Sequence, residues 1–113
     1  SAEPGSCSGT VVGGFCWYHG GEEESCATVC TSHGGYSEGT RTYAGSDGTL
    51  WNCNDVLEVL GAAGTSTGSL SASGRGVGCF LMNLVNDRYW VSDTPTTADA
   101  TYMLGRRACA CNE

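Results

Sequence analysis

The sequence CSGTVVGGFCWY, residues 7–18, contains two short runs of strand-forming residues separated by Gly13 and Gly14. β-Branched and aromatic side chains favour extended backbone, and adjacent glycines favour a tight turn. We therefore predict a β-hairpin in this segment. Cys7 and Cys16 lie on its opposite arms, so a disulfide between them would close the hairpin.

The eight cysteines are spread over the whole chain: Cys7, Cys16, Cys26, Cys30, Cys53, Cys79, Cys109 and Cys111. Such a density in 113 residues is typical of small secreted domains that compensate for a limited hydrophobic core with cross-links. Zinc is the competing interpretation, but the close pairs CATVC and CAC lack the usual zinc spacing. We predict four disulfides, no free thiol and an oxidising compartment. Eight cysteines allow 105 pairings, so spacing alone does not give the connectivity.

Residues 22–33 are predicted to form a first helix. Three consecutive acids, Glu22–Glu24, favour a helix N-terminus through the helix dipole, and the following Gly-Gly pair supplies a left-handed stop. Cys26 and Cys30 are four residues apart, which places both sulfurs on one face of this helix.

A second helix is predicted to end at Gly61, with Asn52 or Asn54 as its N-cap. Residues 36–50 are rich in turn formers and predict a loop with at most one short strand. Residues 61–78 are low in complexity and predict a mobile surface loop or a loop ordered by a ligand. The apolar helix residues expected to face inward are Val56, Leu57, Val59 and Leu60.

Three later segments are compatible with short strands: CFLM at 79–82, RYWV at 88–91 and RRACAC at 106–111. The Thr/Ala-rich stretch between the last two is compatible with a strand as well. A hairpin, two short helices and a short antiparallel sheet together describe an α+β fold. The length predicts a single domain over residues 1–113.

The charge balance excludes several classes of partner. Five arginines, no lysine and 12 acidic residues give a formal net charge of −7, so nucleic acid would be repelled. No apolar run approaches the roughly 20 residues that span a bilayer. The first residues, SAEPGSCSG, have no basic and apolar signal region. We expect a mature extracellular protein, secreted or at the cell surface, that is a monomer or part of a larger surface assembly.

The order of these features resembles that of C-type lectin-like domains, in a compact and divergent form. CSGTVVGGFCWY resembles the family's N-terminal cysteine hairpin, and SCATVCTSHGG and NDVLEVLG resemble its two helices. RYWVSDT resembles its W-x-W-S-D-G stretch, and RRACAC its closing strand. The resemblance implies a disulfide from Cys30 to one of the last two cysteines. Cys26 with Cys53, and Cys79 with the remaining terminal cysteine, are the pairs then left.

The chain also departs from the pattern of that family. After the RYWVSD stretch only 15 residues, 94–108, precede the final cysteine pair, so there is no room for the long loop that carries the family's calcium and sugar site. The E-P-N or Q-P-D triplet of the family is missing from the sequence. Calcium-dependent sugar binding is therefore not predicted, and the chain looks more like the loop-less variants that bind hyaluronan-like glycans or protein receptors.

Aromatic residues are the strongest candidates for a binding site, because they stack on sugar rings and anchor protein interfaces. Tyr89 and Trp90 are adjacent and in a strand would point to opposite faces, so one of them should be outside. Tyr36 and Tyr43 lie in a glycine-rich segment where exposure is expected. The predicted ligand-binding residues are Trp90, Tyr89, Tyr43, Tyr36, Asn86 and Asp87.

Other aromatic and histidine residues are interpreted as structural. Trp17, beside Cys16, is expected to pack on a disulfide, and Trp51 is expected to cover the second helix. His19 and His33 could each serve as a base or a metal ligand, but neither has a local set of partners.

Charged groups give weaker candidates. The glutamates at 22–24 could bind calcium, although a solvated helix start is favoured. Arg106 and Arg107 form a doublet that could meet a sulfate or uronic carboxylate, although pairing with the protein's own acids is favoured. No metal or cofactor is assigned. A second set of oxygen ligands that calcium could use, near Trp90, is Asn83, Asn86, Asp87 and Asp93.

No nucleophile, base and orienting group form a recognisable motif, so we predict that the protein is not an enzyme. The predicted function is recognition of a neutral or weakly charged glycan, and the alternative is a protein-binding adhesion or structural module. A sugar site would show one or two exposed aromatics beside amide or carboxylate groups in a shallow groove. A protein site would show a flat apolar patch larger than a few hundred Å².

Overall fold

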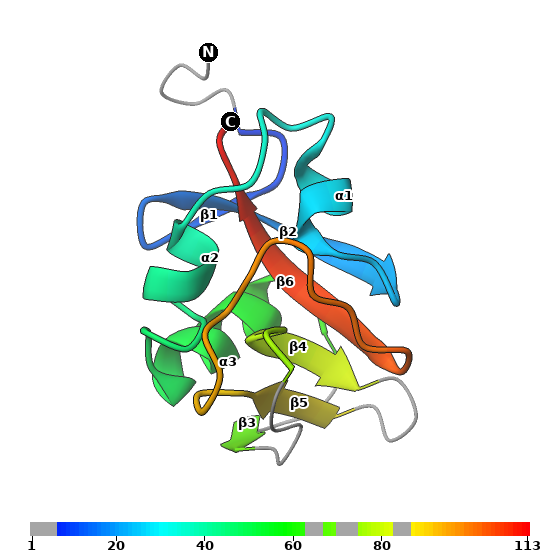
Figure 1. Cartoon of the computed structure of the whole chain (residues 1–113). Helices are drawn as coiled ribbons and strands as arrows, with labels where there is room; N and C mark the ends of the chain where they lie inside the picture. The colour runs from blue at the N-terminus through cyan, green and yellow to red at the C-terminus, as the bar shows by residue number, and fades with distance from the viewer. Residues whose placement is uncertain (1–6, 63–66, 70–74, 83–86) are drawn as a thin grey trace.

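The computed structural model describes residues 7–62, 67–69, 75–82 and 87–113. These residues form a small disulfide-rich α+β fold in which strand β6 crosses the centre of the molecule (Figure 1). The helices are α1 (Cys26–Cys30), α2 (Gly39–Thr42) and α3 (Leu50–Val59). The strands are β1 (Thr10–Val12), β2 (Phe15–Glu22), β3 (Thr67–Ser69), β4 (Cys79–Met82), β5 (Asp87–Trp90) and β6 (Gly105–Cys111).

The strands form one sheet in the order β1-β2-β6-β4-β5-β3. All neighbours are antiparallel except β3 and β5, which are parallel. The predicted hairpin is present as β1 and β2, and its glycines Gly13 and Gly14 have φ of 62° and 85°, a backbone that glycine adopts without strain. The expected strands at 79–82, 88–91 and 106–111 correspond to β4, β5 and β6.

Strand β6 is covered along both edges. Its pairing with β2 runs from Cys16↔Cys111 to Glu22↔Arg106, while β4 pairs only with residues 105–107. Beyond β4, helix α2 takes over this edge. The buried Thr40 hydroxyl donates to the carbonyl of Ala110 at 3.1 Å and accepts from its N–H at 2.8 Å.

Two disulfides join α1 to β6 as adjacent rungs, Cys26–Cys109 and Cys30–Cys111. This arrangement follows from two periodicities: residues four apart share a helix face, and residues two apart share a strand face. The expected link from Cys30 to a terminal cysteine is therefore confirmed, as is the count of four disulfides with no free cysteine.

The other two disulfides lie elsewhere in the fold. Cys7–Cys16 closes the hairpin as predicted. Cys53–Cys79 ties α3 to β4, so the expected pairs of Cys26 with Cys53 and of Cys79 with a terminal cysteine are wrong. These expectations were wrong because they gave the two terminal cysteines partners in different parts of the fold, whereas both cysteines face α1.

The two faces of the sheet carry different parts of the core. On one face, the small residues Ala108 and Ala110 of β6 leave room for Trp17 and for Leu57 of α3, all buried. On the other face lie the α1 cysteines with Cys109 and Cys111, and beside them a cluster around Phe80. β6 is therefore buried on both faces, and every residue of the strand except Arg106 is buried.

Several local expectations are corrected. The first helix begins at Cys26 with Ser25 as its N-cap, because Glu22 extends β2 and Glu23 turns the chain with φ of 60°. Helix α2 lies within 36–50, where a loop or short strand was expected, and β3 lies within the expected loop at 61–78. Helix α3 is capped by Thr49 rather than Asn52 or Asn54, and Val59 is half exposed rather than inward.

Replacing Cys26 and Cys109 by alanine, or Cys30 and Cys111, is expected to cost less than half the stability lost when both bridges are removed together. The two bridges close almost the same loop, with sequence separations of 83 and 81 residues, so one bridge keeps most of the constraint on the unfolded chain. A loop of this size is worth about 4 to 5 kcal/mol. Urea unfolding of the three variants measures the losses, and additive losses would contradict the expectation.

Candidate functional site

A shallow open groove of about 490 Å³ lies where the hairpin meets the end of β6. We call it the hairpin groove. Its lining includes Cys16 and Cys111, which belong to two different disulfides and are register partners in the sheet. Its other lining residues are Gly14, Phe15, Gly34, Ser37, Asn112 and Glu113.

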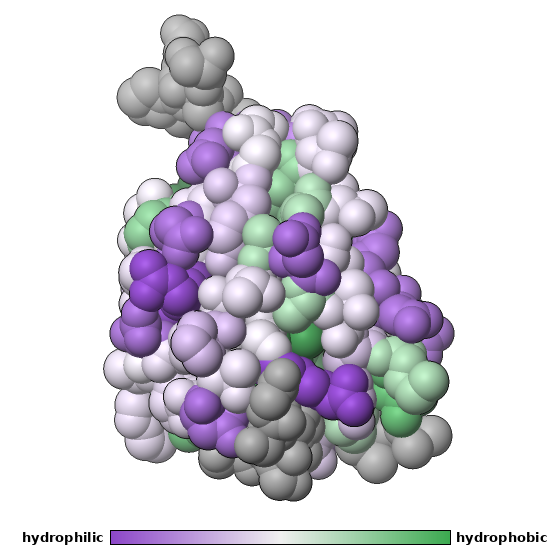
Figure 2. All heavy atoms as spheres, in the orientation of Figure 1, coloured by the Kyte–Doolittle hydropathy of each residue, from purple (hydrophilic) through white to green (hydrophobic). Residues whose placement is uncertain are grey.

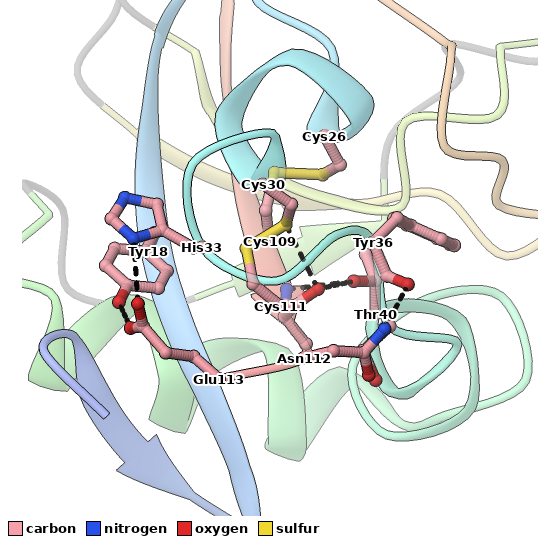
Figure 3. The surroundings of a disulfide bond; sticks show 12 residues. Tyr18, Cys26, Cys30, His33, Tyr36, Thr40, Cys109, Cys111, Asn112 and Glu113 are labelled. Atoms are coloured by element: carbon pink, nitrogen blue, oxygen red, sulfur yellow. Dashed lines mark hydrogen bonds and ion pairs between the residues drawn. A yellow bond between two sulfur atoms is a disulfide. The ribbon is translucent and has the colours of Figure 1, made fainter. Parts of the chain in front are cut away.

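One side of the groove is built on the carboxylate of Glu113 (Figure 3). Ser8 donates to Oε1 from its backbone N–H at 3.1 Å and from its hydroxyl at 2.9 Å, and the Tyr18 hydroxyl donates to the same oxygen. Nδ1 of His33 is 3.2 Å from Oε2, and the His33 ring stacks on Tyr18 with centroids 3.9 Å apart. Glu113 is therefore held at both oxygens by three side chains from separate segments.

This carboxylate cluster does not have the arrangement of a hydrolase triad. Among the hydrogen bonds of the described residues, Ser8 and His33 each contact Glu113 and none joins the serine to the imidazole. A serine nucleophile needs a base within hydrogen-bond reach of its own hydroxyl. The cluster suits the binding and orientation of polar groups.

The other side of the groove supplies an amide, a hydroxyl and an aromatic ring. Asn112 is exposed, and its Nδ2 donates to the carbonyl of Tyr36 at 2.8 Å, which fixes the orientation of the amide. The Ser37 hydroxyl accepts from the N–H of Gly39 at 3.1 Å. Phe15 is half-buried and packs edge-on against Trp17 with centroids 6.5 Å apart.

Gly34, which lines the groove, lies against the backbone of Asn112. A Cβ at this position would overlap the carbonyl of Asn112, and its φ of 85° lies in the left-handed region. Only glycine fits both conditions. The turn after α1 can therefore lie directly against the end of β6.

The predicted residues of β5 are placed on opposite faces, as expected, but neither is fully outside. Trp90 is half-buried against the α3 side of the core, and its Nε1 donates to the carbonyl of Gly45 at 2.8 Å. Tyr89 is half-buried on the other face beside Phe80, with centroids 6.0 Å apart. Both rings are engaged in the core.

The remaining predicted residues are dispersed. Tyr43 was expected to be exposed, but it is half-buried, with its ring over Gly13 and 6.1 Å from Phe15. Tyr36 is also half-buried, and its carbonyl borders the hairpin groove through Asn112. Asp87 accepts from the N–H of the next residue, and Asn86 lies outside the described residues. The six residues do not form one site in the part of the chain that the structure describes.

The largest exposed aromatic was missed. Trp51 is 74% exposed, so the expectation that it covers the second helix is wrong. The signal was present in the sequence: Cys53, Val56, Leu57 and Leu60 follow the i, i+3, i+4, i+7 spacing of an inward helix face, which leaves Trp51 outside. Trp17 is completely buried, as expected, in a cluster that includes the cysteines of the Cys53–Cys79 disulfide.

The charged residues that were expected as possible binding groups also lie apart from one another. Arg106 donates from Nε to the carbonyl of Gly20 at 3.0 Å, whereas Arg107 is buried, so they do not form a joint positive surface. Of the glutamates at 22–24, Glu24 accepts from the N–H of Gly21 at 2.7 Å. The described residues include no group of three or more His, Cys, Asp or Glu side chains that could hold a metal. Asn83 and Asn86 of the proposed oxygen cluster lie outside them.

No helix in the described part of the chain is long and apolar enough to cross a bilayer. Comparison with protein-family models, with characterised proteins and with solved structures found no match.

The partly buried His19 is expected to make the stability of the fold depend on pH. Burial, and secondarily the charge of Arg106, lower its pKa from 6.5 to about 4, and its Nε2 has no partner among the described residues. Between these values the unfolded state binds a proton that the folded state does not, so stability falls as the pH drops from 6.5 towards 4.

From pH 7 to pH 5 the free energy of unfolding is expected to fall by about 1 kcal/mol through His19, after allowance for its partial exposure. Urea midpoints at the two pH values measure the loss. The His19→Gln variant should lack this pH-dependent loss of unfolding free energy, whereas the His33→Gln variant should retain it. An unchanged pH dependence in His19→Gln would refute the assignment.

Proposed function

We propose that this protein is a non-enzymatic, extracellular recognition module that binds glycan in the hairpin groove. The observation that carries the proposal is the combination at this groove of an aromatic ring, Phe15, with the amide of Asn112 and the carboxylate of Glu113. A sugar presents an apolar C–H face and a rim of hydroxyls, which these groups complement. The volume of about 490 Å³ lies in the range of small-ligand sites, about 300 to 1,000 Å³.

The rigidity of the groove supports this function. Disulfides anchor two of its residues, Cys16 and Cys111, and three side chains hold Glu113 in place. A site whose groups are already positioned loses little conformational entropy when it binds. The carboxylate of Glu113 and the net charge of −7 favour neutral sugars over polyanionic ones.

The extracellular assignment is supported by the four disulfides, which persist in oxidising compartments. We also propose that the fold is C-type lectin-like. It is supported by the order of hairpin, helices and terminal strand, and by the disulfide from Cys30 to Cys111 that closes the fold.

A protein-binding module is the second candidate, favoured by one observation. Trp51 and Val59 are 74% and 50% exposed on helix α3, and at 3.6 residues per turn their directions differ by about 80° around the helix axis. On the face that Figure 2 shows, hydrophobic residues form small areas among hydrophilic ones. We favour glycan because the hairpin groove combines an aromatic ring with polar groups.

The test is a glycan array followed by titration of the best sugar, with and without a calcium chelator. Asn112→Ala is expected to weaken binding about tenfold or more, which corresponds to the loss of one hydrogen-bonding group. The chelator is expected to have no effect.

Asn52→Ala is the matched control. Nδ2 of Asn52 donates to the carbonyl of Tyr43 at 2.9 Å, the same type of bond that Asn112 makes to Tyr36, but Asn52 lies on α3 outside the groove. Equal losses in the two variants would refute the groove as the site. Loss of glycan binding in Trp51→Ala alone would move the glycan site to helix α3. If no glycan binds, the protein-binding function moves ahead.

A further inference from the structure

The carboxylate of Glu113, at the hairpin groove, is not compensated by an arginine. Its one ion-pair contact in the described part of the chain is His33, which is charged only when it is protonated. Its other contacts, from Ser8 and Tyr18, come from neutral donors. The described carboxylates that do form ion pairs with arginine lie elsewhere and are those of Glu38, Asp47 and Glu58.

The two oxygens of Glu113 are occupied unequally (Figure 3). Oε1 is contacted by the N–H and the hydroxyl of Ser8 and by the hydroxyl of Tyr18. Oε2 has one contact among the described residues, Nδ1 of His33 at 3.2 Å. An ionised carboxylate has about four acceptor positions. Oε2 therefore retains acceptor capacity for a ligand, and 21% of the Glu113 side chain is open to solvent.

The rest of the hairpin groove carries no charge. Apart from the disulfide-bonded cysteines, Glu113 is the one ionisable residue among those that line it. The side chains of Ser37 and Asn112 are polar and neutral, and Phe15 supplies an apolar ring. The groove therefore combines a single negative charge with neutral hydrogen-bonding groups. A cationic donor gains Coulomb attraction to this carboxylate in addition to its hydrogen bond, which a neutral hydroxyl does not.

The contacts of Glu113 also favour one kind of cation. A guanidinium binds a carboxylate best as a fork through both oxygens, but Oε1 already has three donors around it. Calcium requires about six to eight oxygen ligands, and the described residues include no group of three or more His, Cys, Asp or Glu side chains that could hold a metal. An ammonium group is compact and can donate a single N–H to one oxygen.

We infer that the hairpin groove selects sugars that carry a free amino group, bound as the ammonium ion, over sugars with a hydroxyl in that position. The ammonium donates to Oε2 of Glu113, and the remainder of the sugar contacts Phe15 and Asn112. An N-acetylated sugar lacks the positive charge and therefore this attraction. The inference rests on the proposed glycan function and names the class of glycan, a deacetylated hexosamine.

The first experiment titrates the disulfide-intact protein with chitosan trisaccharide, which consists of β-1,4-linked glucosamine, and with cellotriose, which has a hydroxyl in place of each amino group. The buffer is kept below the pKa of the sugar amine and at constant ionic strength, so that general screening is the same for both sugars. The chitosan trisaccharide is expected to bind about tenfold more tightly, the value of one hydrogen bond between charged groups. The fully N-acetylated trisaccharide should lack this advantage.

Glu113→Gln removes the charge and keeps the size of the side chain. It is expected to lower the affinity ratio of chitosan trisaccharide to cellotriose from about ten to about one. Glu24→Gln is the matched control, because Glu24 is also half-buried and accepts from a backbone N–H, that of Gly21 at 2.7 Å, but lies outside the groove. It changes the net charge by the same amount and should leave the ratio unchanged.

The outcomes separate this inference from the proposed function. Equal affinities for chitosan trisaccharide and cellotriose, with binding still weakened by Asn112→Ala, would overturn the inference and leave the glycan function standing. Absence of binding by all three sugars would overturn both. The comparison of sugars uses the unmodified protein, so it decides the inference even if Glu113→Gln does not fold.

Two further results would also overturn the selection of an amino sugar by Glu113. One is an affinity ratio that is unchanged in Glu113→Gln, or that falls equally in Glu24→Gln. The other is binding of tri-lysine, a peptide with the same net charge as the chitosan trisaccharide, as tightly as the sugar. Tight binding of the peptide would mean that the ammonium groups suffice without the sugar ring.

Discussion

Two disulfides hold helix α1 against strand β6, and they replace the packing that a helix of five residues cannot supply. So short a helix is unstable by itself, because its nucleation cost is not repaid by a few hydrogen bonds. The bridges also cover one face of β6. Its other face, with Ala108 and Ala110, is then free to accept Trp17 and helix α3, so the two layers of the fold meet on this strand.

The same junction shapes the hairpin groove. The bridge from Cys30 to Cys111 holds the turn after α1 beside the end of β6, where Gly34 allows the two backbones to touch. Register pairing of Cys16 with Cys111 brings the hairpin to the same place. Residues that are far apart in the sequence therefore meet beside these disulfides. Ser8, for example, donates a hydrogen bond to Glu113.

The sequence alone determined the class of the fold and most of its strands. Cysteine density predicted four disulfides, and the pattern around Gly13 and Gly14 predicted the hairpin, because these are local or compositional signals. The bridge from Cys30 to a terminal cysteine was implied by family resemblance. The groove was not predicted, because Ser37, Asn112 and Glu113 are unremarkable residues that lie far apart in the sequence.

Only the tertiary structure decided the remaining pairings and the environment of each side chain. Both terminal cysteines face α1 because β6 presents alternate residues to that helix, a fact that depends on which strand face meets which helix. The same alternation buries Arg107 while Arg106 stays near the surface. Tyr43 and Trp90 are half-buried against the core, and Trp51 is a surface residue. Burial is set by contacts between distant segments, and one sequence does not contain those contacts explicitly.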